Sequence, residues 1–91
     1  MRVILTVDGI DAAAEQGVTL PAIKAALAAQ PTLIEDIDAS TRAVTGRVDG
    51  RLVTVWLTEG DDGVWELAVA FEAGFATELK WTHVFGGSDE G

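Results

Sequence analysis

The clearest fold signal lies in residues 43–58, which read AVTGRVDGRLVTVWLT. Two runs rich in β-branched residues, 43–48 and 52–58, flank the dipeptide Asp49-Gly50. An Asp-Gly pair accepts the positive φ angles of a tight type I′ turn, and such a turn joins two antiparallel strands. The stretch therefore predicts a β-hairpin.

Two more strands are predicted after the hairpin. Residues 59–63 contain two glycines and two aspartates and favour a turn. In residues 64–72, large apolar side chains alternate with small or charged ones, so one large apolar face is expected to meet the helices. Residues 77–85 alternate again and predict a last strand, followed by a mobile tail over residues 86–91. The large residues of the first of these strands are Trp65, Leu67, Val69 and Phe71.

The first part of the chain predicts a strand and a short helix. Residues 2–7 are rich in β-branched side chains and predict the strand. Asp8 is positioned to cap a helix over residues 10–16, which contains three consecutive alanines. Gly17 follows as the residue that ends this helix.

A second helix is predicted to begin at the N-cap residue Thr19 and to end before Pro31. Leu20, Ile23 and Leu27 recur at spacings of three and four, so they form an apolar stripe that is expected to lie against the sheet. The next segment, 32–40, mixes apolar and acidic residues and is interpreted as a connecting edge segment more than a regular strand.

Together these elements predict a single α+β domain over residues 1–91. We expect a small antiparallel sheet of about four to five strands with two short helices packed on one face, in the order β-α-α-β-β-β-β. The apolar runs are too short to span a bilayer, and Asp8 and Asp11 interrupt the first run before a signal-peptide core could form. A cytoplasmic protein is therefore expected.

The charge of the chain limits its partners. Fifteen acidic residues against six basic ones give a net charge of −9, which repels phosphate backbones and anionic lipid. One interpretation is that the carboxylates only keep the protein in solution. The other is that they form an acidic face shaped for a basic groove, such as one that normally holds nucleic acid.

Nothing in the sequence predicts catalysis, a metal site or a cofactor. His83 is the single side chain whose ordinary pKa lies near neutrality, and its alternation with Trp81 and Phe85 favours a packed histidine over a catalytic base. The chain has no cysteine, and its paired aspartates lack the ligand spacing of a calcium loop. No glycine-rich phosphate loop is present.

The candidate binding residues are acidic side chains and one tryptophan. The acidic candidates occupy two predicted loops and one strand face, and they are Glu35, Asp36, Asp38, Glu59, Asp61, Asp62, Glu66 and Glu72. Trp56 is expected beside Thr54 and Thr58, on the strand face opposite to Val55. If the C-terminal strand does not cover that face, Trp56 is a candidate interface hot spot.

The stretch from Asp8 to Ala73 also resembles small domains allied to BrnT-type toxins, within the RelE/ParE-like ribonuclease-toxin superfamily. The resemblance rests on Glu15, Gly17 and Val18, on the helix that begins at Thr19, on the run Gly46-Arg47-Val48-Asp49-Gly50-Arg51, and on residues 64–73. It implies an α+β fold of the toxin type and raises the question of ribonuclease activity.

The departures from that family concern its basic residues. Where the family has a histidine and two arginines in the first helix, this chain has Asp8, Ala12 and Gln16. Its strand over residues 64–72 carries Phe71 and Glu72 where such toxins often have an arginine. A ribonuclease of this type needs cations to hold the phosphate and to stabilise its developing charge.

Three functions therefore compete. The leading hypothesis is a non-catalytic inhibitor or immunity-type factor, including a phage or mobile-element anti-defence factor, that occupies a basic nucleic-acid-binding surface of a partner protein. The runner-up is a ribonuclease toxin of a toxin–antitoxin system with relocated catalytic groups. The third is an assembly module that forms a homodimer through its sheet edge or Trp56. The runner-up would use Arg42, Arg47, Arg51, Lys80 and His83.

Overall fold

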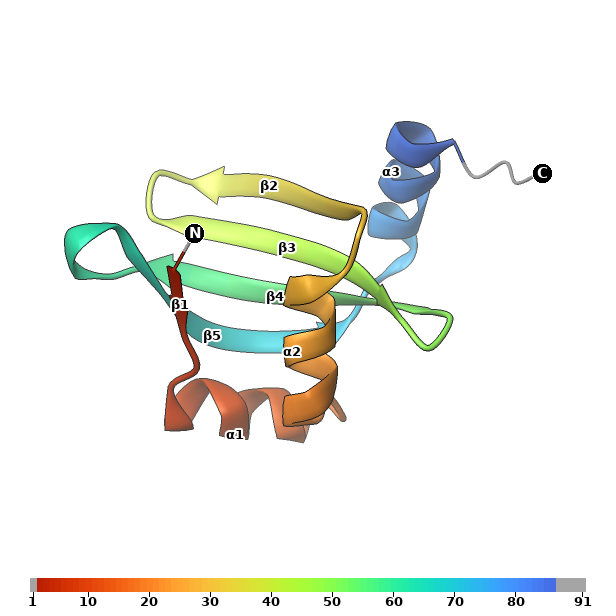
Figure 1. The fold of residues 1–91 in the computed structure, drawn as a ribbon. Helices are drawn as coiled ribbons and strands as arrows, with labels where there is room; N and C mark the ends of the chain where they lie inside the picture. Colours follow the sequence, from red (N-terminus) through yellow and green to blue (C-terminus); the bar gives the residue numbers. More distant parts are fainter. Residues whose placement is uncertain (1, 87–91) are drawn as a thin grey trace.

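A computed structural model of the chain describes residues 2–86 and shows an α+β fold (Figure 1). Five strands form one sheet, and three helices accompany it. In chain order the elements are β1 (Arg2–Ile4), α1 (Val7–Glu15), α2 (Leu20–Ala28), β2 (Thr32–Asp38), β3 (Thr41–Val48), β4 (Arg51–Glu59), the 3-10 turn η1 (Asp61–Gly63), β5 (Val64–Glu72) and α3 (Phe75–Phe85). None of the helices in this part of the chain has the length and apolar character needed to cross a membrane.

The sheet is mixed, with the strand order β1-β5-β4-β3-β2. The four strands β2 to β5 are antiparallel neighbours, whereas β1 pairs with β5 in parallel. The predicted hairpin is confirmed: Asp49 and Gly50 have φ angles of 51° and 83°, and Val48 pairs with Arg51. These two positive angles are those of a type I′ turn, whose twist matches that of the strands it joins.

The two N-terminal helices pack on one face of the sheet, as predicted. Thr19 caps α2 by accepting a hydrogen bond from the backbone N–H of Ala22. The predicted cap of α1 is wrong: Thr6 Oγ1 accepts from Gly9 N–H and donates to the Leu67 carbonyl at 2.9 Å, so α1 begins at Val7 and Asp8 lies inside it. Gly9 allows this close approach, because a Cβ there would lie 2.3 Å from the Leu67 carbonyl oxygen.

The main core lies between these helices and the sheet. Ile23 of α2 is fully buried against inward-facing residues of β3, β4 and β5. Side chains of this size each contribute about 1.5–3 kcal/mol when they leave water. The sheet residues of this core are Val44, Val53, Val55, Leu57, Leu67 and Ala70.

A bulge in β5 corrects the predicted alternation of that strand. Leu57 pairs with Leu67, but the preceding residue Trp56 pairs with Val69, so β5 contains one extra residue at this point. Side chains change faces across a bulge of this kind. Trp65 and Leu67 therefore face the helices, whereas Val69 and Phe71 lie on the opposite face, which we call the far face. Only half of the predicted large apolar face meets the helices.

The predicted last strand over residues 77–85 is wrong, because this segment forms the helix α3. Trp81 and Phe85 are four residues apart, so they share one side of the helix, and they pack on Leu52 and Ala73. Gly86 ends the helix with a φ of 75°, a left-handed conformation that glycine adopts without strain. The rest of the predicted tail lies outside the described residues.

Residues 32–38 form a strand where a connecting edge segment was predicted. They form the edge strand β2, paired with β3 from Thr32↔Gly46 to Asp38↔Thr41, with a shift in register between Asp36 and Asp38. Its partner β3 supplies the strand pairing that the mixed apolar and acidic sequence of residues 32–40 does not reveal. The sheet therefore keeps five strands, with β2 in place of the predicted C-terminal strand.

Candidate functional site

The two predicted acidic loops meet at one end of the sheet. The turn between β2 and β3 and the loop between β4 and β5 lie side by side, because Glu59 N–H donates to the Ser40 carbonyl at 2.8 Å. We call this region the acidic end. Its carboxylates are those of Asp36, Asp38, Glu59, Asp61, Asp62 and Glu66, and all six residues are exposed.

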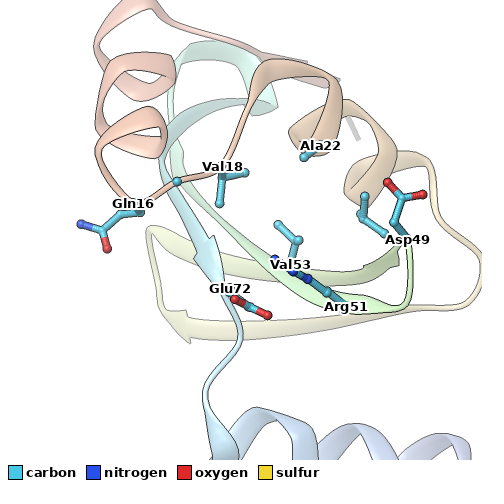
Figure 2. Close-up of a pocket in the computed structure, with 9 residues that line it drawn as sticks. Gln16, Val18, Ala22, Asp49, Arg51, Val53 and Glu72 are labelled. Atoms are coloured by element: carbon cyan, nitrogen blue, oxygen red, sulfur yellow. The ribbon is translucent and has the colours of Figure 1, made fainter.

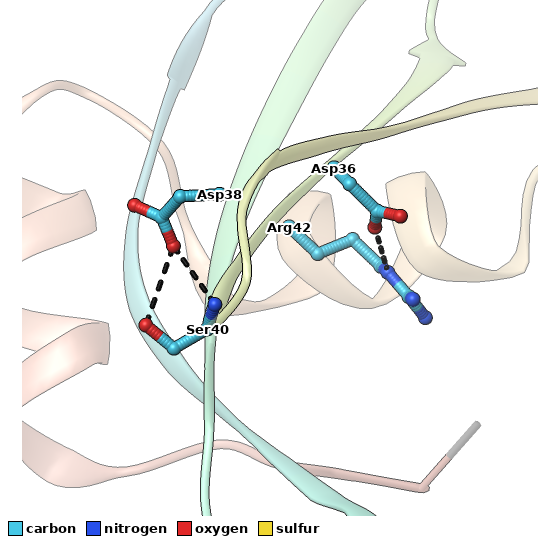
Figure 3. Close-up of polar contacts among 4 residues, drawn as sticks. All are labelled: Asp36, Asp38, Ser40 and Arg42. Carbon is cyan, nitrogen blue, oxygen red and sulfur yellow. Dashed lines mark hydrogen bonds and ion pairs between the residues drawn. The ribbon is translucent and has the colours of Figure 1, made fainter.

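The β2–β3 turn is organised by Asp38. Its carboxylate accepts hydrogen bonds from Ser40 N–H at 2.8 Å and from the Ser40 hydroxyl at 3.3 Å (Figure 3). The backbone N–H of Ser40 stabilises the charged carboxylate, and this lowers the pKa of Asp38 from its ordinary value of 3.8. Asp38 is therefore ionised across the physiological pH range.

The β4–β5 loop presents consecutive carboxylates. Gly60 N–H donates to the Val64 carbonyl at 2.6 Å and closes the loop, while Asp62 takes a left-handed conformation with a φ of 56°. Aspartate adopts this conformation more readily than most residues do. Glu66 lies next to the loop, since a Cβ on Gly60 would be 3.0 Å from its carboxylate oxygen.

Two arginines belong to the same end of the sheet. Arg42 binds Asp36 at 2.8 Å (Figure 3). Its guanidinium lies 4.5 Å from the centre of the Trp65 ring. Arg2 pairs with Val64, next to the β4–β5 loop. The acidic end therefore has six carboxylates and two arginines. Apart from Asp36, the acidic residues of this end form no ion pair within residues 2–86. The acidic end keeps an excess of negative charge.

Two of the predicted acidic residues lie elsewhere. Glu35 is on the far face and binds Lys80 of α3 at 2.7 Å. Glu72 pairs with Val53 near the opposite end of the sheet. Neither residue joins the acidic end.

Trp56 lies on the far face, as predicted from the alternation of β4. It packs edge to face on Phe71, with ring centres 6.0 Å apart, and is half-buried. The helix α3 crosses this face nearer to Leu52 and Leu33. On the same face, the hydroxyls of Thr45 and Thr54 form a buried hydrogen bond of 2.8 Å. Trp56 is thus part of a partly packed surface on the far face.

The opposite end of the sheet carries charges of both signs. We call it the hairpin end, and its charged residues are Arg47, Arg51, Asp49, Glu72 and Glu78. Arg47 lies over the Trp81 ring at 5.6 Å. A shallow opening of about 400 Å³ lies on the helix side of this end, and Figure 2 shows Val18 pointing into it and Gln16 pointing away.

The basic residues of the ribonuclease alternative divide between the two ends of the sheet, and four of the five lie at the hairpin end or on α3. Arg42 belongs to the acidic end, Arg47 and Arg51 to the hairpin end, and Lys80 binds Glu35. His83 is exposed on α3. In the part of the chain that the structure describes, no three His, Asp or Glu side chains form a group that could hold a metal ion.

Sequence reasoning found the acidic residues but missed what joins them. The Ser40 carbonyl links the two loops, and the pairing of β2 with β3 brings it into place. Only the Asp-x-Ser spacing of 38–40 signalled a local turn. Comparisons with protein-family models, curated proteins and solved structures found no match to this chain.

Proposed function

We propose that this chain is a non-catalytic interaction protein whose acidic end occupies a basic surface of a partner protein. The surface of the partner is of the kind that otherwise holds nucleic acid, so the chain would act as an inhibitor or immunity-type factor. The observation that carries this proposal is the junction of two acidic loops through the Glu59–Ser40 hydrogen bond.

The position of the charge supports binding over mere solubility. Carboxylates that only keep a protein in solution can lie anywhere on its surface. Here six of the fifteen acidic residues of the chain belong to two adjoining loops and the strand positions next to them, while the hairpin end has two arginines for three carboxylates. Such a local excess creates a field that steers a basic partner toward one end of the molecule.

Co-purification from the native host with two matched variants tests this proposal. The acidic-end variant carries Glu59→Gln, Asp61→Asn and Asp62→Asn, and the hairpin-end variant carries Asp49→Asn, Glu72→Gln and Glu78→Gln. Each removes three carboxylates and keeps the shape of the side chains. Asparagine also tolerates the positive φ angles of Asp49 and Asp62.

We expect the wild type and the hairpin-end variant to retain the same protein partner, identified by mass spectrometry, and the acidic-end variant to lose it. Retention should also fall when sodium chloride is raised from 50 to 300 mM, because salt screens exposed charges. Equal retention by the two variants, or retention that does not weaken with salt, would contradict the proposal.

The ribonuclease alternative has its own test. Purified wild type is mixed with RNA at physiological ionic strength, and both cleavage and binding are measured. We expect neither, because the acidic end repels phosphate and two of the basic residues, Arg42 and Lys80, are bound to carboxylates. Cleavage or tight binding of RNA would favour the ribonuclease toxin and contradict the proposal of a non-catalytic interaction protein.

A further inference from the structure

The edge strand β2 has an open backbone along one side. The sheet order ends at β2, so within residues 2–86 no strand lies beyond it. The other edge strand, β1, has three residues, whereas β2 has seven. A long edge strand with no strand beyond it presents N–H and C=O groups on which another chain can add a strand (Figure 1).

The register shows which backbone groups point outward. In a hairpin with a two-residue turn, the residues that flank the turn, Val48 and Arg51, direct their N–H and C=O groups toward each other. The direction then alternates along β3, so Ala43 and Thr45 point toward β2. The bond from Glu59 N–H to the Ser40 carbonyl has the direction that this alternation requires.

The alternation continues into β2. Leu33 and Glu35 pair with Thr45 and Ala43, so their backbone groups point inward to β3. Those of Ile34 and Asp36, and of Thr32 before them, therefore point outward to the open edge. An added strand would bond to these residues.

The side chains of β2 select the kind of strand that can be added. Ile34 and Ile37 are 52% and 48% exposed and lie on the same strand, so an added strand could contact them. On the same strand, Glu35 and Asp36 are already bound to Lys80 and Arg42, so the negative charge that no ion pair within residues 2–86 offsets is that of Asp38 and the adjoining β4–β5 loop. An extended segment that carries both basic and apolar residues would meet this charge and the isoleucines.

A second copy of the chain fits this edge poorly. Antiparallel pairing of two β2 strands about their centre would place Glu35 opposite Glu35, and Asp36 opposite Ile34. Like charges in cross-strand positions are destabilising, and each copy also carries a net charge of −9.

We propose that β2 is the docking strand for an extended, basic segment of the partner protein, which adds to the sheet as a further strand. This inference rests on the proposed function and specifies how the partner binds. The acidic end supplies attraction, and the outward groups of Ile34 and Asp36 fix the register of the added strand.

A pair of synthetic peptides separates strand addition from simple charge attraction. The probe is an eight-residue peptide of alternating lysine and valine, and the control has the same sequence with every backbone amide N-methylated. The control keeps the charge and loses every backbone donor. Affinity is measured for the full chain by isothermal titration calorimetry, and amide hydrogen exchange is followed by NMR.

We expect the probe to bind at least tenfold more tightly than the control, as the loss of two or more net hydrogen bonds implies. The amides of Ile34 and Asp36 should become protected from exchange only with the probe. Equal affinity of the chain for the two peptides would overturn strand addition, but it would not contradict the proposal that the acidic end binds a basic partner. No binding of the probe at 20 mM salt would also overturn it.

Variants of one residue give a second readout. Ile34→Pro removes an outward N–H and is compatible with an edge strand, whereas Ile34→Thr keeps that N–H and a β-branched side chain. We expect Ile34→Pro to lose at least tenfold in probe affinity and Ile34→Thr to lose less than threefold. If Ile34→Pro does not fold, the affinities of the wild type for the probe and for the N-methylated control decide whether a strand is added. A wild-type dimer that Ile34→Pro dissociates in analytical ultracentrifugation would overturn the basic partner in favour of a second copy.

Discussion

The two ends of the sheet differ in how they are packed. At the hairpin end, α3 covers the sheet through the buried Trp81, and Arg47 lies over its ring. At the acidic end the two loops are exposed, and a backbone hydrogen bond from Glu59 N–H to the Ser40 carbonyl joins them. Stability should therefore depend on the hairpin end, whereas binding should depend on the acidic end. The predictions below test this division.

The largest effect on stability is expected from the tryptophan of α3. Trp81 is 6% exposed and packs with Leu52, Ala73 and Phe85. Trp81→Ala leaves a cavity under α3, and we expect it to lower the free energy of unfolding by about 3 kcal/mol. Urea denaturation followed by circular dichroism gives this value. A loss below about 1 kcal/mol would show that α3 does not stabilise the hairpin end.

Two glycines offer a matched comparison between the ends. A Cβ on Gly46 would lie 2.5 Å from the Ala26 carbonyl oxygen, a backbone atom that the docking of α2 holds in place. Gly46→Ala should therefore cost about 2 kcal/mol, because the helix must move away from the sheet. Thermal and urea unfolding of the variant measure the loss.

The control is Gly60→Ala at the acidic end. The nearest atom to its Cβ would be a carboxylate oxygen of Glu66 at 3.0 Å, at the far end of a flexible side chain. We expect a change below about 1 kcal/mol. If the two alanine variants were equally destabilised, the acidic end would be as tightly packed as the hairpin end, and the comparison would fail.

The smallest effect concerns the charge of Asp38. Because Ser40 N–H lowers the pKa of Asp38 in the folded state, ionisation of this group favours folding. The wild type should be slightly more stable than Asp38→Asn above about pH 4, the ordinary range of an aspartate pKa. This difference should disappear as the pH falls through the lowered pKa of the folded state.

Unfolding of both proteins at pH 7, 4 and 2.5 measures this trend, and an NMR titration of the Asp38 carboxyl gives its pKa directly. A difference in stability between the wild type and Asp38→Asn that grows as the pH falls would contradict this prediction. It would show that the Ser40 bond does not favour the charged form.

Local signals in the sequence predicted the parts of the fold that short segments determine. Asp49 and Gly50 form the turn that their φ preferences require, and Thr19 caps α2 through its own side chain. The spacing of Ile23 with its neighbours likewise predicted the buried side of α2. In each case the interacting residues lie within a few positions of one another.

The errors arose where distant residues decide the structure. The alternation in residues 77–85 is compatible with a strand, but Trp81 and Phe85 also share one side of a helix, and packing on Leu52 selects the helix. The bulge in β5 exists only in relation to β4, and the sequence of β5 does not mark it. The acidic residues could be named from the sequence, but the Glu59–Ser40 bond that brings them together depends on three strands.

The rate of association with the co-purified partner shows whether the acidic end recognises that partner. It is measured by stopped flow at 20 and 300 mM salt for the wild type and for the two triple variants described above. The account predicts that the acidic-end variant associates at least tenfold more slowly than the wild type at 20 mM salt, and that this gap narrows at 300 mM. The hairpin-end variant should match the wild type. Equal rates for the two variants at low salt would contradict the claim that the acidic end recognises the partner.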